Sequence, residues 1–393
     1  MYSNIFILFL VFFLFGGENV LSAYGFNFTE VTMIFFFVGL AVIILLGNKV
    51  LKIKEYLWFM VFAGTYAITR FATNGVDGLF RLTSLLFGGI IMLGVFATPY
   101  QVRLHNISKA FPKILITFYI AECLVAIYER TTGTLVFGMP NSVTFMEEGD
   151  MGAFRSCSLL GHPLQNALIV TTIMTFILFS SITNKWKYSL WLLGYLSILC
   201  FNTRSSMVGN ILILFAYVAI QFNDSKNLLR GVSVLVTVSI LLAISYYFMS
   251  TYEWGGRLID MGLVDDNSAQ ARINAFNIFD YITWKDILWG YSKNIDILTH
   301  NAGIGILENF WIGWLLQYGI FVVILFVLLM FFLLRKLYKN FTLFTAIVTA
   351  GSFWLIASTN NSLAWTYTPE AIFFLCVLVF SPNNKNFLPS LLR

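Results

Sequence analysis

Long runs of apolar residues follow one another along almost the whole chain and constrain its fold more than any other feature. A helix that crosses a bilayer needs about 20 mostly apolar residues, and a helix satisfies its own backbone groups where no water is present. The candidate runs are 4–16, 31–47, 56–73, 79–98, 111–128, 163–182, 187–201, 207–222, 230–249, 308–334, 341–358 and 364–380. We therefore predict an all-α polytopic integral membrane protein with about twelve transmembrane helices.

The composition excludes a soluble protein. Hydrophobic residues make up 59% of the chain and charged residues 11%, whereas a soluble domain carries roughly 25% charged residues. No basic stripe interleaved with aromatic residues is present, so we expect no nucleic-acid partner. No linker or internal repeat divides the chain, which predicts a single membrane domain over 1–393. The run 4–16 lacks a preceding basic region, and we interpret it as the first span rather than a signal peptide.

The lysines and arginines predict the orientation, because short cytoplasmic loops are rich in both. With the N-terminus inside, the cytoplasmic side receives fifteen of the 24 basic residues. The longest loops, 129–162 and 250–307, then both lie outside. We predict cytoplasmic N- and C-termini, a multi-pass protein of the bacterial inner (plasma) membrane, and a large periplasmic loop over 250–307 between spans 9 and 10.

The two sides differ in their choice of basic residue. The inside set has eleven Lys and four Arg, and the outside set has seven Arg and two Lys. Arginine binds phosphate through a planar, two-pronged contact, so an arginine-rich outer face indicates an anionic ligand such as a pyrophosphate. The alternative is that these arginines pair with outer acids, namely Glu147, Glu148, Asp150, Asp260, Asp265 and Asp266.

Arg204 lies in the very short segment Phe201–Ser206 between two spans. A charge at the membrane boundary is costly unless it is paired or faces a wet cavity, and free N–H groups at a helix start attract anions. This placement favours a functional arginine. The alternative is an arginine that reaches to the interface, with Ser205 or Ser206 as helix cap.

The large outer loop contains a predicted amphipathic helix that begins at Ser268. Arg272 lies on its polar face, and Arg257 precedes it in the loop. The predicted apolar positions of this helix are Ile273, Phe276, Ile278 and Phe279.

Two of the three histidines are candidate site residues. His300, followed by Asn301 and then Glu308, lies outside, where an imidazole can act as a general base near working pH. His162 precedes Pro163, which predicts a helix start with the imidazole as a cap or supporting group. A purely structural histidine remains the alternative for each. The four cysteines are scattered, only Cys157 well inside an outer loop, and they predict neither a disulfide framework nor a metal site.

Several of these strings, in this order, resemble the bacterial O-antigen polymerase and ligase superfamily, that is, the Wzy-type polymerases and their ligase relatives. The resemblance covers about 160–320 and extends to the span count and the large outer loop. The strings are Gly161-His162-Pro163, Thr203-Arg204-Ser205-Ser206, Arg272 with Phe276 and Phe279, Trp289-Gly290, and His300-Asn301 before Gln317-Tyr318-Gly319.

The resemblance implies a glycosyltransferase that joins undecaprenyl diphosphate-linked oligosaccharide repeat units at the outer face of the membrane, for O-antigen, capsule or exopolysaccharide. It implies Arg204 and Arg272 as catalytic stabilisers of the departing diphosphate, His300 as the base, and no cofactor or metal. A flippase and a chain-length regulator are the implied partners, besides the lipid bilayer. The predicted substrate-binding residues are Arg257, Arg155, His162, Glu308 and Asn301.

One departure separates the two branches of this superfamily. The ligases resemble this chain as far as His300-Asn301 but continue with a Gly and Thr, and here no Thr follows Gly313 at that place. This favours a polymerase over an O-antigen ligase that moves glycan to lipid A-core. A flippase of lipid-linked oligosaccharide is the third alternative; Glu122 and Glu370 are its best mid-span acids, but the two halves of the chain are unlike each other.

Overall fold

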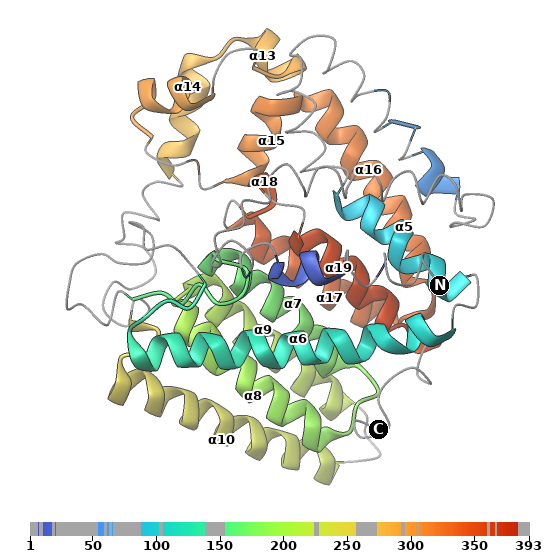
Figure 1. The fold of residues 1–393 in the computed structure, drawn as a ribbon, viewed down its shortest axis with the longest axis vertical. Coiled ribbons are helices and arrows are strands. Elements are labelled where there is room, and N and C mark those ends of the chain that lie inside the picture. Colours follow the sequence, from blue (N-terminus) through green and yellow to red (C-terminus); the bar gives the residue numbers. More distant parts are fainter. Residues whose placement is uncertain are drawn as a thin grey trace.

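The computed structural model is helical throughout the part that it describes (Figure 1). That part comprises 88–101, 105–137, 154–223, 228–256, 273–291, 295–304, 307, 309–359, 362–365 and 368–383, with short pieces before residue 66. The first half contains η1 (Phe13–Gly17), α5 (Gly88–Gln101), α6 (His105–Thr132), α7 (Pro163–Phe179), α8 (Asn184–Phe201), α9 (Arg204–Asn223) and α10 (Leu228–Tyr252). The second half contains η3 (Ala275–Tyr281), α13 (Trp284–Trp289), α14 (Ile295–Asn301), α15 (Phe310–Tyr318), α16 (Ile320–Leu337), η4 (Tyr338–Asn340), α17 (Leu343–Ser358), α18 (Ser362–Trp365) and α19 (Thr368–Val379).

Three helical segments are long and apolar enough to cross a membrane, and they are Asn106–Thr132, Leu235–Tyr252 and Ile320–Asn340. Four shorter apolar helices accompany them over Pro163–Phe179, Arg204–Ile220, Leu343–Ser358 and Thr368–Val379. Both groups coincide with apolar runs of the sequence. The prediction of a helical membrane protein is therefore confirmed for the described residues.

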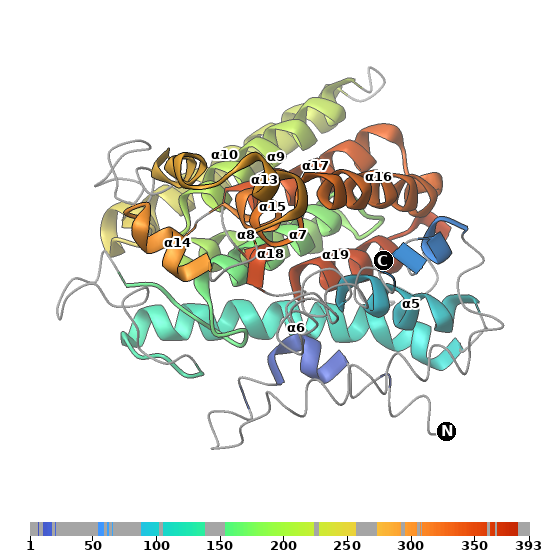
Figure 2. The ribbon, with the colours of Figure 1, turned by 90° about the horizontal axis from the view of Figure 1, so that it is seen from above.

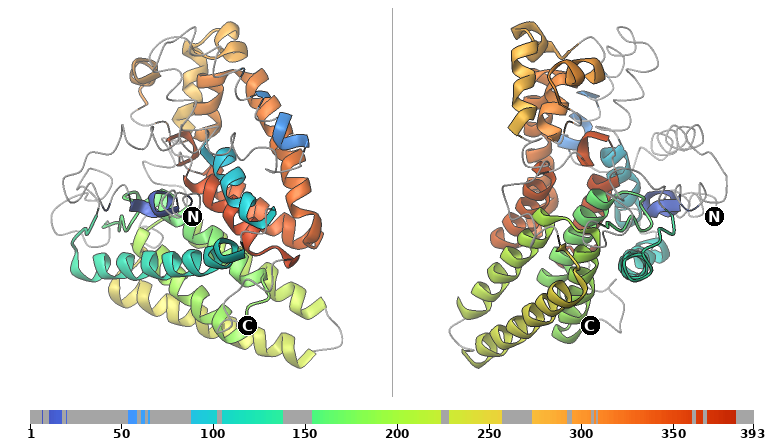
Figure 3. Two further views of the ribbon diagram at one scale, coloured as in Figure 1. Left: turned by 45° about the vertical axis from the view of Figure 1, so that its right-hand side comes forward. Right: turned by 90° about the vertical axis from the view of Figure 1, so that its left-hand side faces the viewer.

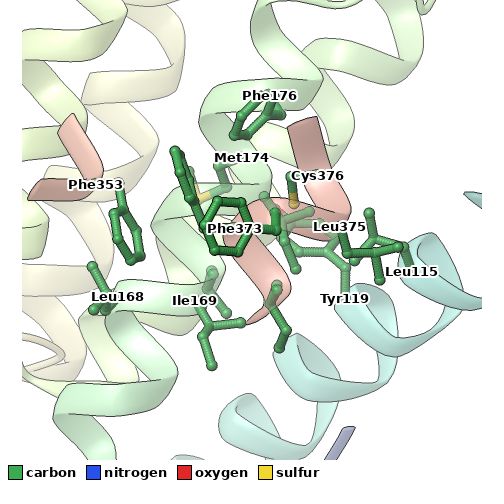
Figure 4. Packing of buried hydrophobic residues seen from close by; sticks show 14 of the residues in the cluster. Leu115, Tyr119, Leu168, Ile169, Met174, Phe176, Phe353, Phe373, Leu375 and Cys376 are labelled. Atoms are coloured by element: carbon green, nitrogen blue, oxygen red, sulfur yellow. The ribbon is translucent and has the colours of Figure 1, made fainter. Parts of the chain in front are cut away.

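Helix α7 forms the centre of the bundle. It packs against α8, α9, α17 and α19, and Figure 2 shows it between α6 on one face and α10 on the other. Figure 4 shows Phe353 of α17 and Phe373 of α19 beside α7, and their rings stack with centroids 4.4 Å apart. A helix buried on all sides needs no polar face toward water, and the few polar residues of α7, such as Asn166 and Thr171, are buried with its apolar ones.

Gly194 lets α8 approach α6 and α7 closely. A Cβ atom at this position would collide with the hydroxyl of Tyr119 and the sulfur of Met174. The same hydroxyl donates a hydrogen bond of 2.6 Å to the carbonyl of Leu190. The contact therefore depends on the absence of a side chain at residue 194.

The predicted tenth span is two helices rather than one. The run 308–334 is divided into α15 and α16 by Gly319, whose φ of 78° and ψ of 159° lie in a region that only glycine adopts readily. An added Cβ there would also meet backbone atoms of Leu288 and Trp289. Hydropathy alone does not register such a break, because the residues on both sides are equally apolar.

The described residues between 273 and 316 pack around an apolar cluster of their own. Ala275, Ile278 and Leu298 are buried there together with Ile312 and Leu316 of α15. Figure 3 shows η3, α13 and α14 (light orange) as a group at one end of the molecule, away from α10. We call this group, with the residues of its cluster, the external region, after the sequence prediction that the loop 250–307 lies outside.

The described part of the predicted amphipathic helix is a 3-10 helix, η3. Its period of three places Ala275 and Ile278 on the buried side, whereas Ile273 and Phe276 are exposed. Of the four predicted apolar positions, Ile278 is buried and Phe279 packs against the apolar cluster, whereas Ile273 and Phe276 do not reach it. The predicted start at Ser268 lies outside the described residues.

Candidate functional site

A cluster of polar side chains closes one end of the bundle. Segment 154–162 crosses there between the ends of α6 and α8. Ser156 fixes this crossing, because its amide donates to the carbonyl of Cys200 at 3.1 Å and its hydroxyl donates to the carbonyl of Ala126 at 2.8 Å. We call residues 122–132, 154–162, 200–206 and 253–256 the polar end.

The carboxylate of Glu129 anchors segment 154–162 to α6. Its Oε2 accepts from the amides of Cys157 at 2.8 Å and Ser158 at 2.9 Å, and its Oε1 accepts from the amide of Val136 at 2.8 Å. Glu129 is fully buried. Hydrogen bonds from backbone amides to a buried carboxylate are among the strong ones, so this side chain fixes the position of the segment.

Glu122, about two helical turns before Glu129 on α6, binds the next part of segment 154–162. Its Oε2 accepts from the amide of Leu159 at 3.2 Å, and its backbone carbonyl accepts from the hydroxyl of Ser158 at 2.8 Å. Ser158 has a φ of 44°, in the left-handed region. Two carboxylates seven residues apart on one helix face thus hold a tight turn of the crossing segment.

Arg130 joins three parts of the chain that are far apart in sequence. Its guanidinium donates to the carbonyl of Phe154 at 2.9 Å and to the carbonyl of Glu253 at 2.6 Å. The side chain is 1% exposed. A buried cation is costly without hydrogen-bond partners. The two bonds from Arg130 therefore hold both segment 154–162 and the start of the large loop after α10 in position.

Arg155 lies beside the turn that follows α8. It is 7% exposed, and its Nε donates to the carbonyl of Phe201 at 3.3 Å. The turn itself depends on Asn202, which ends α8 with a left-handed φ of 53°. Thr203 then donates its hydroxyl to the same Phe201 carbonyl at 3.2 Å. The guanidinium of Arg155 is therefore held at the peptide segment that leads into Arg204.

Arg204 is the first residue of α9, as the sequence predicted. Its side chain is partly exposed. The predicted cap by Ser205 or Ser206 is wrong, because the residue before the helix is Thr203, whose carbonyl accepts the first helical bond from Met207 at 3.1 Å. The polar end thus contains Arg155, which is bonded to the carbonyl of Phe201, and Arg204, which begins the next helix three residues later.

Behind Arg204, a polar seam runs between α9 and α7. The amide nitrogen of Asn210 donates to the hydroxyl of Thr171 at 2.8 Å and to the carbonyl of Ser206 at 2.7 Å. Within the described part of the chain, Ser206 Oγ, Asn210 Oδ1 and Asn166 Oδ1 are buried without a hydrogen-bond partner. Buried polar atoms of this kind attract water or the hydroxyl groups of a ligand.

His162 precedes α7 and starts it together with Pro163, as predicted. Its side chain makes no capping hydrogen bond, so the interpretation of the imidazole as a helix cap is wrong. Burial and the positive charge of Arg155 lower the pKa of His162 to about 4. The imidazole is consequently neutral at pH 7, and it lies close enough to Arg155 for that positive charge to oppose its protonation.

Cys157 is buried, although the sequence placed it well inside an outer loop. Segment 154–162 lies against the helix ends instead of projecting from them. Burial and the neighbouring carboxylate of Glu129 raise the pKa of Cys157 to about 12. Its thiol stays protonated at neutral pH, so it is a packing residue rather than a nucleophile.

His300 and Asn301 end α14 in the external region, and both side chains are exposed. Leu298 of the same helix faces the apolar cluster with Ala302 and Ile304. The backbone turns at Gly303, whose φ is 68°. The structure therefore places the predicted base in the external region and the pair Arg155 and Arg204 in the polar end.

Three predicted site residues, Arg257, Arg272 and Glu308, lie outside the described residues. Two residues of the polar end, Glu129 and Arg130, were not predicted as site residues. An acid and a base side by side at the end of a long apolar run are the signal that could have identified them, since charges at that depth need partners.

The chain matches no known family model, no curated protein and no solved structure.

Proposed function

We propose that this protein is a membrane glycosyltransferase that polymerises undecaprenyl diphosphate-linked oligosaccharide repeat units at the outer face of the bacterial plasma membrane. The observation that carries the proposal is that two arginines lie at the turn after α8, where Arg155 bonds the carbonyl of Phe201 and Arg204 begins α9, with neutral His162 near Arg155. The resemblance of the sequence strings to the Wzy-type polymerases supplies the substrate class.

The proposed topology has about twelve spans with both termini in the cytoplasm. In support of this topology, the polar end brings together the C-terminal ends of α6, α8 and α10 and the start of α9. Each of these four helix ends adjoins a loop that the sequence assigns to the outside. Lys109 and Lys185, in contrast, lie in the first turns of α6 and α8, at the opposite ends of these helices. The arginine pair then faces the side where the large loop lies.

The proposed reaction transfers a glycan from its lipid diphosphate to a hydroxyl of another repeat unit. The acceptor oxygen forms a bond to the anomeric carbon, and the bond from that carbon to the diphosphate oxygen breaks with its electron pair on the diphosphate. Arg155 and Arg204 would stabilise this growing negative charge through paired N–H donors. The hydroxyls and amides of the polar seam offer contacts for sugar hydroxyls.

The acceptor proton passes to an imidazole, and the chain offers two. His300 is exposed on the external region, and His162 lies beside Arg155. A bound diphosphate would offset the charge of Arg155 and raise the pKa of His162 toward its usual range, which would make it a better proton acceptor. Separate substitutions of these histidines decide between them.

The contacts of Glu122 weigh against transport of the lipid-linked glycan as the main activity. A transporter uses mid-membrane acids to bind or relay ions, but here one carboxylate oxygen of Glu122 holds the backbone of Leu159. Oε1 of Glu122 and Oε1 of Glu370 are buried without a partner among the described residues, so the contact with Leu159 accounts for one oxygen of one acid only. The ligase alternative, in which glycan moves to lipid A-core, uses the same chemistry and differs only in the acceptor.

The test is an assay in liposomes with purified protein and the undecaprenyl diphosphate-linked repeat unit of its host, without nucleotide sugars. We expect a ladder of lengthening glycans from the wild type. Arg204→Ala and Arg272→Ala should each reduce the ladder by about 100-fold or more, the usual size of a lost charge-stabilising group. Of His300→Ala and His162→Ala, the variant that removes the proton acceptor should show a loss of the same size. Arg155→Lys keeps a buried charge and tests the two-pronged contact alone.

Lys285→Ala is the matched control, because it removes an exposed positive charge from α13 of the external region. It should leave the ladder unchanged. Transfer only to an added lipid A-core acceptor would move the assignment to a ligase. Passage of the lipid-linked substrate across the bilayer without any transfer would contradict the enzyme.

A further inference from the structure

An apolar groove lies between α16 and α17, and the residues that line it follow all the residues of the polar end in the sequence. It has a volume of about 690 Å³, and its walls are aromatic and aliphatic side chains of α15, α16, η4 and α17. Cavities of roughly 300–1,000 Å³ are of the size that holds single small ligands. Among the residues that line it, Arg335 is the charged one.

The groove arises because the two helices of this hairpin have different neighbours. Helix α16 packs against α13 and α15, whereas α17 packs against α7 and α9. The helices meet at η4 and diverge from there. Because α16 is one of the helices apolar enough to cross a bilayer, we place the groove at the depth of the hydrocarbon region, where lipid chains are the surrounding solvent.

The two ends of the groove differ in chemistry. At the η4 end, Arg335 lies in the last turn of α16, next to Tyr338, whose hydroxyl bonds Thr349 at 3.0 Å. At the other end, the rings of Trp311 and Trp354 lie 6.3 Å apart, and the indole N–H of Trp311 donates to the hydroxyl of Ser358 at 2.8 Å. A cation at one end and tryptophans at the other match the head and tail of an anionic amphiphile.

We infer that the groove binds one acyl chain of an anionic glycerophospholipid from the cytoplasmic leaflet, with the lipid phosphate at Arg335. The positive-inside pattern places the η4 turn, with Arg335, Lys336 and Lys339, on the cytoplasmic side. Lys336 is engaged by Glu55 at 3.7 Å, and Arg335 faces the groove. Basic pockets between transmembrane helices on that side recognise acidic head groups.

Two other occupants fit the groove less well. A partner helix laid in it would cover Arg335 and would have to supply a counter-charge for it, whereas a phosphate brings its own. The lipid diphosphate of the proposed reaction would have its charge at the polar end, on the opposite side of the membrane. The inference therefore depends on the predicted topology but not on the proposed activity.

Gly351 makes the groove testable. It lines the groove on α17, and a Cβ at this position would meet no atom within 4 Å. Gly351→Leu should therefore fill the groove without displacing the helix, and Gly351→Ala, which leaves most of the space open, is its matched control. Arg335→Gln removes the charge of the groove, and Lys339→Gln removes a neighbouring exposed charge that does not line it.

The experiment measures phosphatidylglycerol and phosphatidylcholine binding to the detergent-purified full-length protein by native mass spectrometry, with thermal unfolding in parallel. We expect the wild type and both controls to bind phosphatidylglycerol about fivefold more tightly than phosphatidylcholine, the effect of one well-placed basic residue. Arg335→Gln should lose this preference. Gly351→Leu should lose the bound lipid and still unfold cooperatively.

Three results would overturn the inference. The first is equal binding of the two lipids by the wild type. The second is full retention of lipid by Gly351→Leu. The third is a shift of Gly351→Leu from dimer to monomer without any change in bound lipid, which would identify a second copy of the chain as the occupant.

Discussion

The polar end and the external region are held together by different physical means. In the polar end, buried charged groups of α6 bind backbone atoms that are up to 123 residues away in sequence. In the external region, a small apolar cluster packs under polar side chains that remain exposed. A substitution in the polar end therefore affects folding and any activity together, whereas His300 can be changed with little cost to folding.

The largest expected effect comes from Glu129→Ala. It leaves three backbone amides, those of Val136, Cys157 and Ser158, without their acceptor. Since each buried unsatisfied donor costs about 1–3 kcal/mol, we expect a loss of about 4 kcal/mol in the free energy of unfolding, measured by denaturant titration in mixed micelles. Glu253→Gln, which changes an exposed carboxylate and not its bonded carbonyl, should cost little. Equal losses in the two variants would contradict the anchoring role of Glu129.

The pH dependence of stability tests the polar end a second way. The folded pKa of His162, about 4, lies below its usual 6.5. The folded state therefore opposes protonation of this group, and the stability it contributes is complete above pH 6.5 and lost as the pH falls toward 4. The shift corresponds to at most about 3 kcal/mol.

His162→Gln should flatten the dependence of the unfolding free energy on pH between pH 6.5 and 4 relative to the wild type. Unfolding titrations at a series of pH values measure this. An unchanged slope in His162→Gln would mean that the imidazole is as well solvated in the folded protein as in the unfolded one.

A smaller effect is expected in the external region from Ile278→Ala. The side chain is fully buried in the cluster with Leu298 and Leu316, and we expect a loss of about 2 kcal/mol, near the low end for a core isoleucine because the cluster is small. Phe276→Ala, at a position 58% exposed, should change stability by less than about 0.5 kcal/mol. Hydrogen exchange of the amides of η3 and α14 reports both. A larger loss of stability in Phe276→Ala than in Ile278→Ala would instead support the predicted α-helix, with Phe276 on its apolar face.

The smallest expected effect is that of Gly303→Ala. Its φ of 68° is left-handed, but a Cβ there would meet no atom within 4 Å. We expect a cost of about 1 kcal/mol from the backbone alone. Gly351→Ala, also in open space but helical, should slightly stabilise the protein. Thermal unfolding of the two variants separates backbone strain from packing. A larger loss of stability in Gly351→Ala than in Gly303→Ala would contradict the role of backbone strain at Gly303.

The sequence predicted the elements whose determinants are local. Hydropathy located α7, α8, α9 and α17 to within a few residues, and Pro163 and Thr203-Arg204 marked helix starts. The apolar helices depend on the hydrophobicity of residues close together in the sequence, and each helix start depends on the backbone geometry of a single residue. The predicted membrane helices of the described part follow from the same local property.

The polar end could be predicted only in fragments. Arg155, His162 and Arg204 were candidates, but nothing local indicates that Arg155 binds the carbonyl of Phe201, 46 residues away. The anchoring role of Glu129 was missed for the same reason, since its partners are amides of a segment that reads as an outer loop. The length of the run 308–334 is compatible with a first helix at the outer interface before the span, but hydropathy does not locate the break at Gly319, because a change of backbone direction leaves hydropathy unaltered.

The contact between Arg130 and the carbonyl of Glu253 also sets an order of assembly during synthesis. At about 5–20 residues per second, the ribosome needs roughly 6–25 s to make the 123 residues between them. During that interval α6 is already complete, and the guanidinium of Arg130 has only acceptors that precede α10. The polar end is therefore completed only after Glu253 has been synthesised, and a nascent chain that stops short of this residue lacks one of the carbonyl acceptors of Arg130.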